Sequence, residues 1–295
     1  MWREEKMIAG IIVAAVVAVL IIAVCVRGIW ENHALQCNPL TVEDEKLPAA
    51  FDGLRIAHIS DLHNTRFGKD QQNLIGLLRE EKPDLIVVTG DLIDKRRPGM
   101  RNALDFAAQA VRIAPVCYVP GNHEAASAEY PELRMRLAGL GLILLEDRAL
   151  PYKREEGVLT LMGVADPRMC VPNENAAIAR CMQEKLAAVT KGMEGYQILL
   201  AHRPETLTQY AQAGIDLAFC GHAHGGQFRL PWGGIIAPNQ GFFPKITAGI
   251  YRQGGTQMVV SRGLGNSWIP IRLFNRPEVL LVTLRRAKTA VSEKK

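Results

Sequence analysis

Five of the seven histidines occur in short clusters, most of them with aspartate, asparagine or glycine, and each cluster follows an apolar run that predicts a β-strand. In open α/β sheets, ligands bind at the carboxyl ends of strands, so we expect side chains from separate clusters to meet there. Glycine in such clusters lets the backbone turn tightly and approach a ligand. The clusters are Asp61-Leu62-His63, Gly90-Asp91, Gly121-Asn122-His123, Ala201-His202 and Gly221-His222-Ala223-His224.

The donor atoms of these clusters suit divalent metal ions. Carboxylate, amide and imidazole ligands together favour Mn, Fe or Zn over a thiolate site or an all-oxygen calcium site. Residues two apart in extended backbone share a face, so Asp61 with His63, and His222 with His224, can each present two donors to one region. The donors outnumber the ligands of a single ion. They indicate two cations that share a carboxylate, a recurrent arrangement for in-line displacement at phosphorus.

Each cluster taken alone also has a structural interpretation. An Asp-x-His pair commonly makes a cap or a local hydrogen bond, and Gly-Asp after a strand is commonly a turn. His58 lies inside a predicted strand and His33 in a polar segment, so we interpret the first as structural and the second as solvated. The prediction of chemistry therefore depends on five such clusters occurring in one chain, each at a predicted strand end.

The elements that must position these clusters alternate between strands and helices, which predicts an α/β fold with a parallel or mixed sheet. Polar residues and a shift of hydrophobic period separate the elements. We see no internal repeat and no low-complexity segment. Strands are predicted at 54–60, 85–89, 116–119, 142–145, 158–164, 197–201, 217–220, 257–261 and 279–284, and helices at 71–81, 101–112 and 174–190.

The overall composition is that of a globular protein. The chain has 295 residues, a formal net charge of +5 and 48% hydrophobic residues, and its mean hydropathy is +0.02. These values exclude a disordered chain, a collagen and a multi-span transporter. Most of the positive excess lies in the basic tail at 287–295 and the two arginines before it. No arginine-rich stripe with interleaved aromatics is present, so we expect no nucleic-acid partner.

Residues 7–26 form an apolar run without a charged side chain. As a helix, 20 residues extend about 30 Å, enough to cross the hydrocarbon core of a bilayer. A buried core helix would have a polar face, and a cleaved signal peptide would end in a small-x-small site that Ala23-Val24-Cys25 fits poorly. We therefore predict a transmembrane anchor at 7–26, a linker at 27–48 and a single catalytic domain at 49–286, with the membrane lipid bilayer as a partner.

The charges beside the anchor bear on its orientation. Arg3 and Lys6 precede the run, offset by Glu4 and Glu5, and Arg27 follows it. The positive-inside rule then favours a single-pass cell-membrane protein with an extracytoplasmic catalytic domain. The opposite orientation, with a cytoplasmic enzyme acting on nucleotide-linked lipids, remains the alternative.

With these motifs in place, the sequence resembles the calcineurin-like metallophosphoesterases from about residue 54 to residue 284. The resemblance implies an α/β fold in which a β-sandwich is flanked by helices in α-β-β-α layers, here preceded by one N-terminal transmembrane helix. Stretches 60–64, 225–227 and 261–265 look like the membrane-anchored bacterial branch, which is similar to UDP-2,3-diacylglucosamine pyrophosphatases. The motifs are Asp61-x-His63, Gly90-Asp91-x-x-Asp94, Gly121-Asn122-His123-Glu124, His202 and Gly221-His222-x-His224.

The resemblance also implies a role for each motif residue. One metal would be held by Asp61, His63, Asp91 and His224, and the other by Asp91, Asn122, His202 and His222, so that Asp91 is the bridge. His123 would protonate the leaving oxygen or stabilise the transition state. Asp94 would support the site from behind the ligands, or else cap a helix.

The expected function is a membrane-anchored, dinuclear phosphoesterase that hydrolyses phosphodiester or pyrophosphate bonds. A hydroxide shared by two divalent cations, Mn, Fe or Zn, would attack phosphorus in line. The substrate would be a phosphorylated small molecule or a nucleotide-lipid. Two alternatives stay open at this point: a phosphomonoesterase, and a non-catalytic binding module that uses the metals for stability.

Three further features have weaker interpretations. Arg203 and Arg262 could contact phosphate, although structural or surface roles are the commoner ones for arginine. The Gly- and Pro-rich segment 227–245 contains Phe228, Trp232, Phe242 and Phe243. These aromatics would form either an apolar lip for a lipid or ring, or ordinary packing beneath a long loop.

Overall fold

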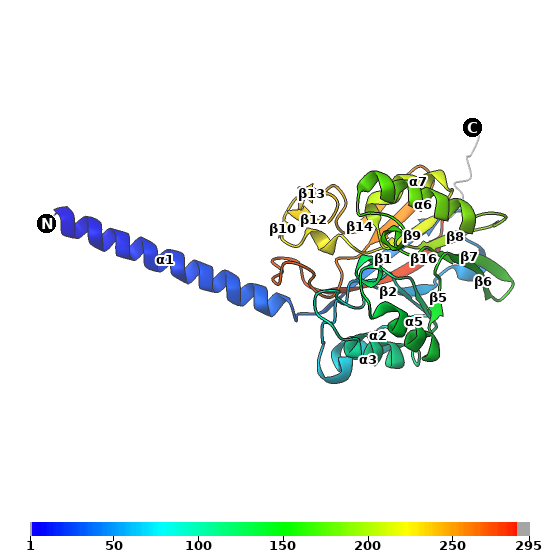
Figure 1. Ribbon diagram of the computed structural model, residues 1–295, viewed down its shortest axis with the longest axis horizontal. Coiled ribbons are helices and arrows are strands. Elements are labelled where there is room, and N and C mark those ends of the chain that lie inside the picture. Colours follow the sequence, from blue (N-terminus) through cyan, green and yellow to red (C-terminus); the bar gives the residue numbers. More distant parts are fainter. Residues whose placement is uncertain (1, 288–295) are drawn as a thin grey trace, which may run out of the picture.

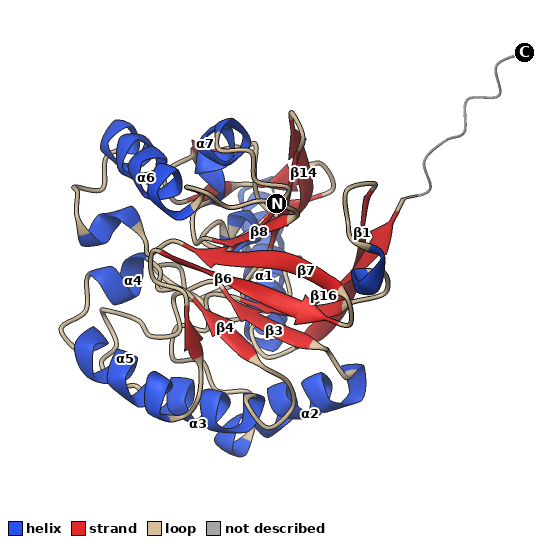
Figure 2. Cartoon of the chain, turned by 90° about the vertical axis from the view of Figure 1, so that its right-hand side faces the viewer, coloured by secondary structure: helices blue, strands red, loops and turns tan. Residues whose placement is uncertain are grey.

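The computed structural model describes residues 2–287 and contains two six-stranded β-sheets packed face to face. Helices cover the outer face of each sheet, as Figure 2 shows, which gives the predicted α-β-β-α layers. The terminal residues 288–295, most of the predicted basic tail, lie outside the described residues. One long helix projects from the domain (Figure 1).

The first sheet has the order β1-β16-β2-β3-β4-β5. Strands β2 to β5 run parallel, while β16 pairs antiparallel with β2 and parallel with β1. Its strands are β1 (Gln36–Asp44), β16 (Glu278–Arg286), β2 (Arg55–Ile59), β3 (Leu85–Val88), β4 (Val116–Tyr118) and β5 (Ile143–Leu144).

The second sheet has the order β14-β15-β9-β8-β7-β6. Strands β15, β9, β8 and β7 form parallel pairs, and the two outer hairpins are antiparallel. Its strands are β14 (Gly249–Gln253), β15 (Thr256–Val260), β9 (Leu217–Cys220), β8 (Gln197–Leu200), β7 (Gly157–Gly163) and β6 (Arg148–Arg154). A small lobe holds the short strands β10 (Arg229–Leu230), β11 (Gly233–Gly234), β12 (Ile236–Ala237) and β13 (Gly241–Phe242).

Alternation along the strands builds three buried layers. In β3, Leu85 and Val87 point between the sheets, whereas Ile86 and Val88 point toward the helices. The helices over the first sheet are α2 (Gln72–Glu81), α3 (Arg101–Ala110) and α5 (Tyr130–Gly139), and those over the second are α6 (Asn175–Val189) and α7 (Leu207–Gln212). The short helix α4 (Asn122–Ala125) carries a candidate ligand. Since both faces of both sheets are buried, near-continuous apolar strands are expected here.

The predicted irregular linker at 27–48 is corrected by the structure. Helix α1 (Trp2–Glu31) continues past the apolar run, and β1 then joins the edge of the first sheet beside β16. The sequence of β1 is polar and contains Pro39, so it lacks the apolar pattern that predicts a strand. Proline is tolerated there because an edge strand has a side without a ladder partner. The first sheet therefore includes residues from Gln36 onward, within the predicted linker.

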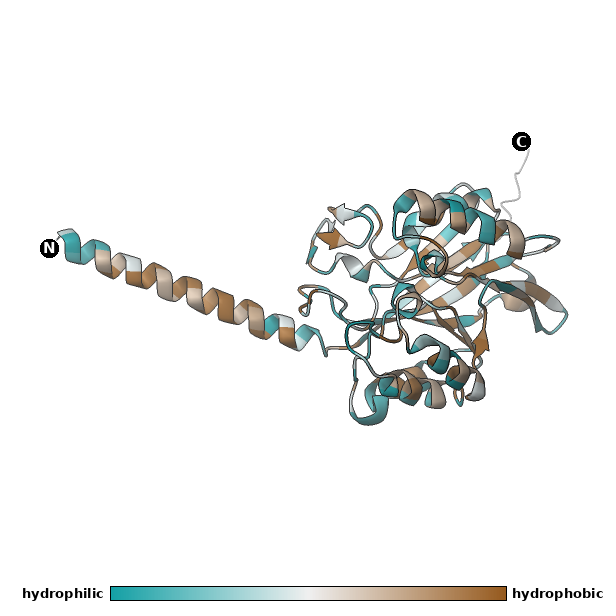
Figure 3. Ribbon diagram, viewed as in Figure 1, coloured by the Kyte–Doolittle hydropathy of each residue, from teal (hydrophilic) through white to brown (hydrophobic). Residues whose placement is uncertain are grey.

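Helix α1 is long and apolar enough to cross a membrane, and the described residues contain no second such helix. Its most apolar window has a mean hydropathy of 3.2 and is not buried against the rest of the protein. Figure 3 shows the apolar residues along the shaft of α1 and polar residues at both of its ends. This confirms one candidate span around the predicted run at 7–26.

Candidate metal centre

Five strand ends deliver the predicted clusters to one place. In the first sheet, β2, β3 and β4 end immediately before or close to Asp61, Asp91 and Asn122. In the second, β8 and β9 end just before His202 and His222. Because these strands run parallel within each sheet, their carboxyl ends share one edge, and the two sheets are packed so that both edges meet. All seven predicted ligands lie in this region.

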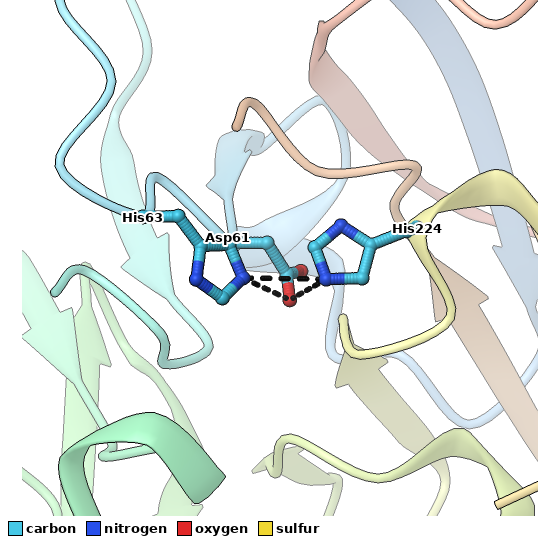
Figure 4. Close-up of side chains that lie close together, drawn as sticks. All are labelled: Asp61, His63 and His224. Atoms are coloured by element: carbon cyan, nitrogen blue, oxygen red, sulfur yellow. Dashed lines mark hydrogen bonds and ion pairs between the residues drawn. The ribbon is translucent and has the colours of Figure 1, made fainter. Parts of the chain in front are cut away.

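Asp61, His63 and His224 form the first group of candidate ligands, and Figure 4 shows the two rings on either side of the carboxylate. The Nε2 atoms of His63 and His224 are 3.2 Å apart. Asp61 Oδ1 lies 3.8 Å from His63 Nε2 and 3.5 Å from His224 Nε2. All three side chains are buried, so packing against the rest of the fold fixes their positions.

Asp91, His202 and His222 form a second group. His202 Nε2 is 3.2 Å from Asp91 Oδ2 and 3.1 Å from Asn122 Oδ1. His222 Nε2 also lies 3.1 Å from the amide oxygen of Asn239, a residue outside all of the predicted motifs.

Asp91 belongs to both halves of the centre. Its Oδ2 atom, which faces His202, is also 3.6 Å from His63 Nε2. A third group of potential ligands, Asp91, His63 and His123, overlaps the other two. A carboxylate placed between two donor sets is the arrangement that two neighbouring cations require.

The donor chemistry of the second group fits a cation. His202 Nδ1 is 2.7 Å from the backbone oxygen of Thr89, which can only accept, so Nδ1 carries a hydrogen. The opposite nitrogen then faces the acceptor oxygens of Asp91 and Asn122 with its lone pair unless it is also protonated. A metal-binding histidine is commonly fixed by this kind of bond from its other nitrogen.

The charges of the centre show how strongly its carboxylates attract positive charge, here a proton on His202. Burial alone lowers the pKa of His202, but the nearby Asp91 carboxylate outweighs it and raises this pKa to about 10. Burial raises the pKa of Asp91, yet His202 and His123 hold it well below its ordinary value. Burial lowers the pKa of His224 to about 3, which leaves its ring neutral at ordinary pH. The site thus combines the ionised carboxylate of Asp91 with the neutral imidazole of His224, which can coordinate a cation.

His123 lies beside the candidate ligands with a separate set of contacts. Its ring is edge-on to His63, with centroids 4.5 Å apart. Nδ1 is 3.1 Å from Asp94 Oδ1, and Nε2 is 3.2 Å from Ser267 Oγ. Burial lowers the pKa of His123, but Asp91 and Asp94 outweigh it and raise the pKa above the ordinary histidine value. A protonated ring in this position can donate a proton from Nε2.

Asp94 therefore positions His123 rather than capping a helix. It is buried and also bonds Arg97 Nε at 3.0 Å, while the following helix α3 has Met100 at its N-cap. Its position next to His123 is the one that the supporting role requires. The helix-cap alternative is wrong for the described helices.

Glu124 and two glycines complete the support beneath Asp91. The buried carboxylate of Glu124 accepts hydrogen bonds from the backbone N–H groups of Asp91 (2.7 Å), Gly121 (2.8 Å) and Ile93 (3.1 Å). A Cβ on Gly121 would overlap the Asp91 carboxylate, and one on Gly90 would overlap the Gly121 backbone. The sequence contained the signal for Glu124 in its Gly121-Asn122-His123-Glu124 motif, but only the fold shows which loops it joins.

A cavity of about 550 Å³ opens onto the centre. The candidate ligands Asp91, Asn122, His222 and His224 line its floor together with His123. Two cationic side chains and several apolar ones form its walls. These wall residues include Lys95, Arg96, Ile236, Trp268 and Ile269.

The structure distinguishes structural from exposed positions among the remaining candidate residues. Arg203 is fully buried and bonds both oxygens of Asp166, so its role is structural. Arg262 lies 3.4 Å from Glu278. His58 is buried and bonds Thr89 Oγ1 at 2.8 Å, as its structural interpretation predicts. Trp232, Phe242 and Phe243, in contrast, are 70–77% exposed and do not pack beneath their loop.

The fold and the site together define a calcineurin-like phosphoesterase. The model of that family matches residues 54–226, more than half of the chain, and the chain belongs to the family. It is 29% identical over 297 residues to a zebrafish (Danio rerio) transmembrane protein with a metallophosphoesterase domain, an alignment that covers 96% of this chain and 65% of that protein.

Two further likenesses concern activity and fold. UDP-2,3-diacylglucosamine pyrophosphatase LpxG of Chlamydia muridarum is 26% identical, with 89% of this chain and 94% of that protein covered. The crystal structure of TT1561 from Thermus thermophilus superposes with a TM-score of 0.50 at 14% identity, covering 72% of this chain and 90% of that one. The second likeness is one of fold alone.

Proposed function

We propose that this chain is a membrane-anchored, metal-dependent phosphoesterase that hydrolyses phosphodiester or pyrophosphate bonds. The observation that carries the proposal is the placement of Asp91 between two buried donor groups. One divalent cation would be held by Asp61, His63, Asp91 and His224. The other would be held by Asp91, Asn122, His202 and His222. The donor types accept Mn, Fe or Zn.

Two bound cations would supply Lewis acidity and a water molecule activated near neutral pH for in-line attack at phosphorus. The protein's own groups supply the proton for the leaving oxygen and the positive charge that binds the phosphoryl group. His123, oriented by Asp94, protonates the leaving oxygen through Nε2. Lys95 and Arg96 at the cavity wall attract the phosphoryl oxygens or a second phosphate.

The lining of the cavity supports a phosphoester with a sizeable organic group. Beyond the candidate ligands, the wall continues through Ile236, Trp268 and Ile269. We favour a diester or a pyrophosphate because it carries a second group that can contact this apolar wall. The likeness to a protein named as a UDP-2,3-diacylglucosamine pyrophosphatase supports the same choice and makes nucleotide-lipids the first substrates to test.

Helix α1 would anchor the enzyme as a single-pass cell-membrane protein. Its length and its exposed apolar surface support this, as does the likeness to a protein named as a transmembrane protein. The flanking charges favour an extracytoplasmic catalytic domain. Protease accessibility of the domain in intact cells tests that orientation.

The activity is tested on the full chain in detergent, stripped with a chelator and then resupplied with Mn²⁺. We expect hydrolysis of bis(p-nitrophenyl) phosphate or of a nucleotide-lipid pyrophosphate, in preference to p-nitrophenyl phosphate. Asp91→Asn should lower turnover by about two orders of magnitude or more, because the shared carboxylate is lost. Asp105→Asn on the outer helix α3 is the matched control. Metal binding without turnover on any of these substrates would instead favour the non-catalytic alternative.

A further inference from the structure

The end of α1 is packed onto the domain rather than joined to it by a flexible tether. Asn32 donates from Nδ2 to the Pro270 carbonyl at 2.7 Å, and its Oδ1 accepts from Arg272 N at 3.0 Å. Glu31 Oε2 accepts from Asn275 N at 3.1 Å. Gly28 packs so closely against Ile271 that a Cβ at residue 28 would overlap that side chain. We call residues 266–276 the collar loop.

The collar loop also borders the candidate active site. Ser267 Oγ contacts His123 Nε2, and Trp268 and Ile269 line the cavity. The loop therefore contacts the end of α1 on one side and the proposed proton donor on the other. The cavity rim has a fixed position relative to the helix.

This position determines how far the rim stands from a bilayer. Gly28 lies two residues beyond the apolar run, which is about 3 Å along a helix axis. If α1 spans the membrane, the residues that pack on Gly28 lie at the level of the lipid headgroups. Trp30, 52% exposed, marks the same level with a side chain favoured at membrane interfaces.

The face from which α1 emerges carries the exposed aromatic side chains of the domain. Figure 1 shows β10, β12 and β13 on this face. Among described residues beyond α1, the exposed tryptophan and phenylalanine side chains all lie between 232 and 274. They are Trp232 (77% exposed), Phe242 (73%), Phe243 (70%), Trp268 (76%) and Phe274 (61%).

Folding alone does not explain these residues. Phe243 and Phe274 each have φ of +53°, a left-handed conformation that is rare for bulky residues. Asparagine or glycine would be less strained at either position, and neither aromatic ring gains burial in exchange. Lys245 stands two residues from Phe243, and such a pairing of cation and aromatics suits an anionic lipid surface.

We infer that Trp232, Phe242, Phe243, Trp268 and the collar loop form a membrane-docking surface, with which the domain rests on the bilayer that α1 crosses. The partner is the lipid surface itself. The cavity mouth, bordered by Trp268, then opens among the headgroups, so that the enzyme takes phosphoesters carried on lipids. This inference rests on the proposed function for the anchor and the substrate.

Tryptophan fluorescence tests the docking in full-length protein reconstituted into phosphatidylcholine–phosphatidylglycerol vesicles with brominated acyl chains. The chain has four tryptophans, so four variants can each retain a single one through Trp→Phe changes at the others. The Trp232-only and Trp268-only variants should lose emission to an extent similar to Trp30-only. Val158→Trp in a tryptophan-free chain is the control, since Val158 is 47% exposed on the β6–β7 hairpin, away from α1.

The alternative results overturn the inference in distinguishable ways. Quenching of Trp30 without quenching of Trp232 and Trp268 means that the anchor inserts while the domain stands clear of the bilayer. Unquenched but blue-shifted emission of Trp232 and Trp268 means that a second copy of the chain covers the surface. Absence of quenching for Trp30 would refute both the proposed anchor and the proposed docking surface.

A substrate comparison tests the consequence for activity. Trp232→Gln, Phe242→Gln and Phe243→Gln combined should lower turnover of a p-nitrophenyl phosphodiester carried on diacylglycerol in vesicles. Turnover of soluble bis(p-nitrophenyl) phosphate should stay unchanged. Equal turnover of the lipid substrate by wild type and variant overturns the inference, as does an equal loss on both substrates. Inactivity of the wild-type enzyme on both would refute the proposed function, while the fluorescence result would still decide the docking.

Discussion

Ser267 Oγ lies 3.2 Å from His123 Nε2 and also accepts a hydrogen bond from Arg96 Nη2 at 2.8 Å. With Asp94 on the other ring nitrogen, the imidazole is held from both sides. A proton donor fixed in this way needs little reorganisation when a phosphoester binds. The same serine belongs to the loop on which α1 packs, so the candidate chemistry and the candidate anchor are linked through one hydroxyl group.

A double-mutant cycle tests the pairing of Asp94 with His123. His123→Ala should lower kcat by about 10²-fold or more, because general acid catalysis contributes on this scale. Asp94→Asn should lower it less, and adding it to His123→Ala should cost little further, since the carboxylate acts through the ring. Metal content measured by atomic absorption should stay near wild type in all three variants. Additive losses in kcat would contradict the positioning role of Asp94.

Glu124→Gln should destabilise the fold around the centre. The substitution keeps the size of the side chain but replaces one acceptor oxygen with a donor that faces backbone N–H groups. We expect a loss of about 1–3 kcal/mol in the free energy of unfolding, measured by urea titration of the metal-free protein. Glu132→Gln, which alters an exposed pair with Arg136, is the control. Equal stability of the two variants would argue against the bridging role of Glu124.

His58 should make the fold acid-sensitive. Burial lowers the pKa of His58 from 6.5 to about 3, so its neutral form is favoured in the folded state. The resulting stability is present above pH 6.5 and is lost as the pH falls toward 3, by about 2 kcal/mol between pH 7.5 and pH 5. His58→Gln should remove this part of the pH dependence in urea titrations at the two pH values. An unchanged difference between them would show that His58 titrates normally.

The sequence predicted the strands that carry the site better than the strands at the edges. Buried parallel strands such as Leu85–Val88 are short apolar runs followed by chemistry-bearing residues, so composition alone marks them. The edge strand Gln36–Asp44 is polar, so its pattern predicts a linker. Its strand identity depends on pairing with a strand more than 230 residues away. Local pattern contains no information on such a partner.

The same distinction applies within the site. The seven candidate ligands could be predicted because each belongs to a recognisable motif at a strand end. They are Asp61, His63, Asp91, Asn122, His202, His222 and His224. Ser267 and Asn239 could not be predicted, since each lies in an irregular loop and reaches the centre only through tertiary packing. The link between α1 and the cavity rim likewise emerges only from the folded collar loop.

A glycine pair on α1 tests that link. Gly28→Val should push Ile271 and the collar loop away, moving Ser267 and Trp268 without touching a candidate ligand. We expect a fall in kcat of about tenfold, as for a displaced positioning group, with unchanged metal content. Gly10→Val is a matched control on the same helix, where no atom lies within 4 Å of the added Cβ. Assays of both variants with bis(p-nitrophenyl) phosphate in detergent decide the question. Similar kcat values for the two would mean that the packing of α1 does not position the cavity rim.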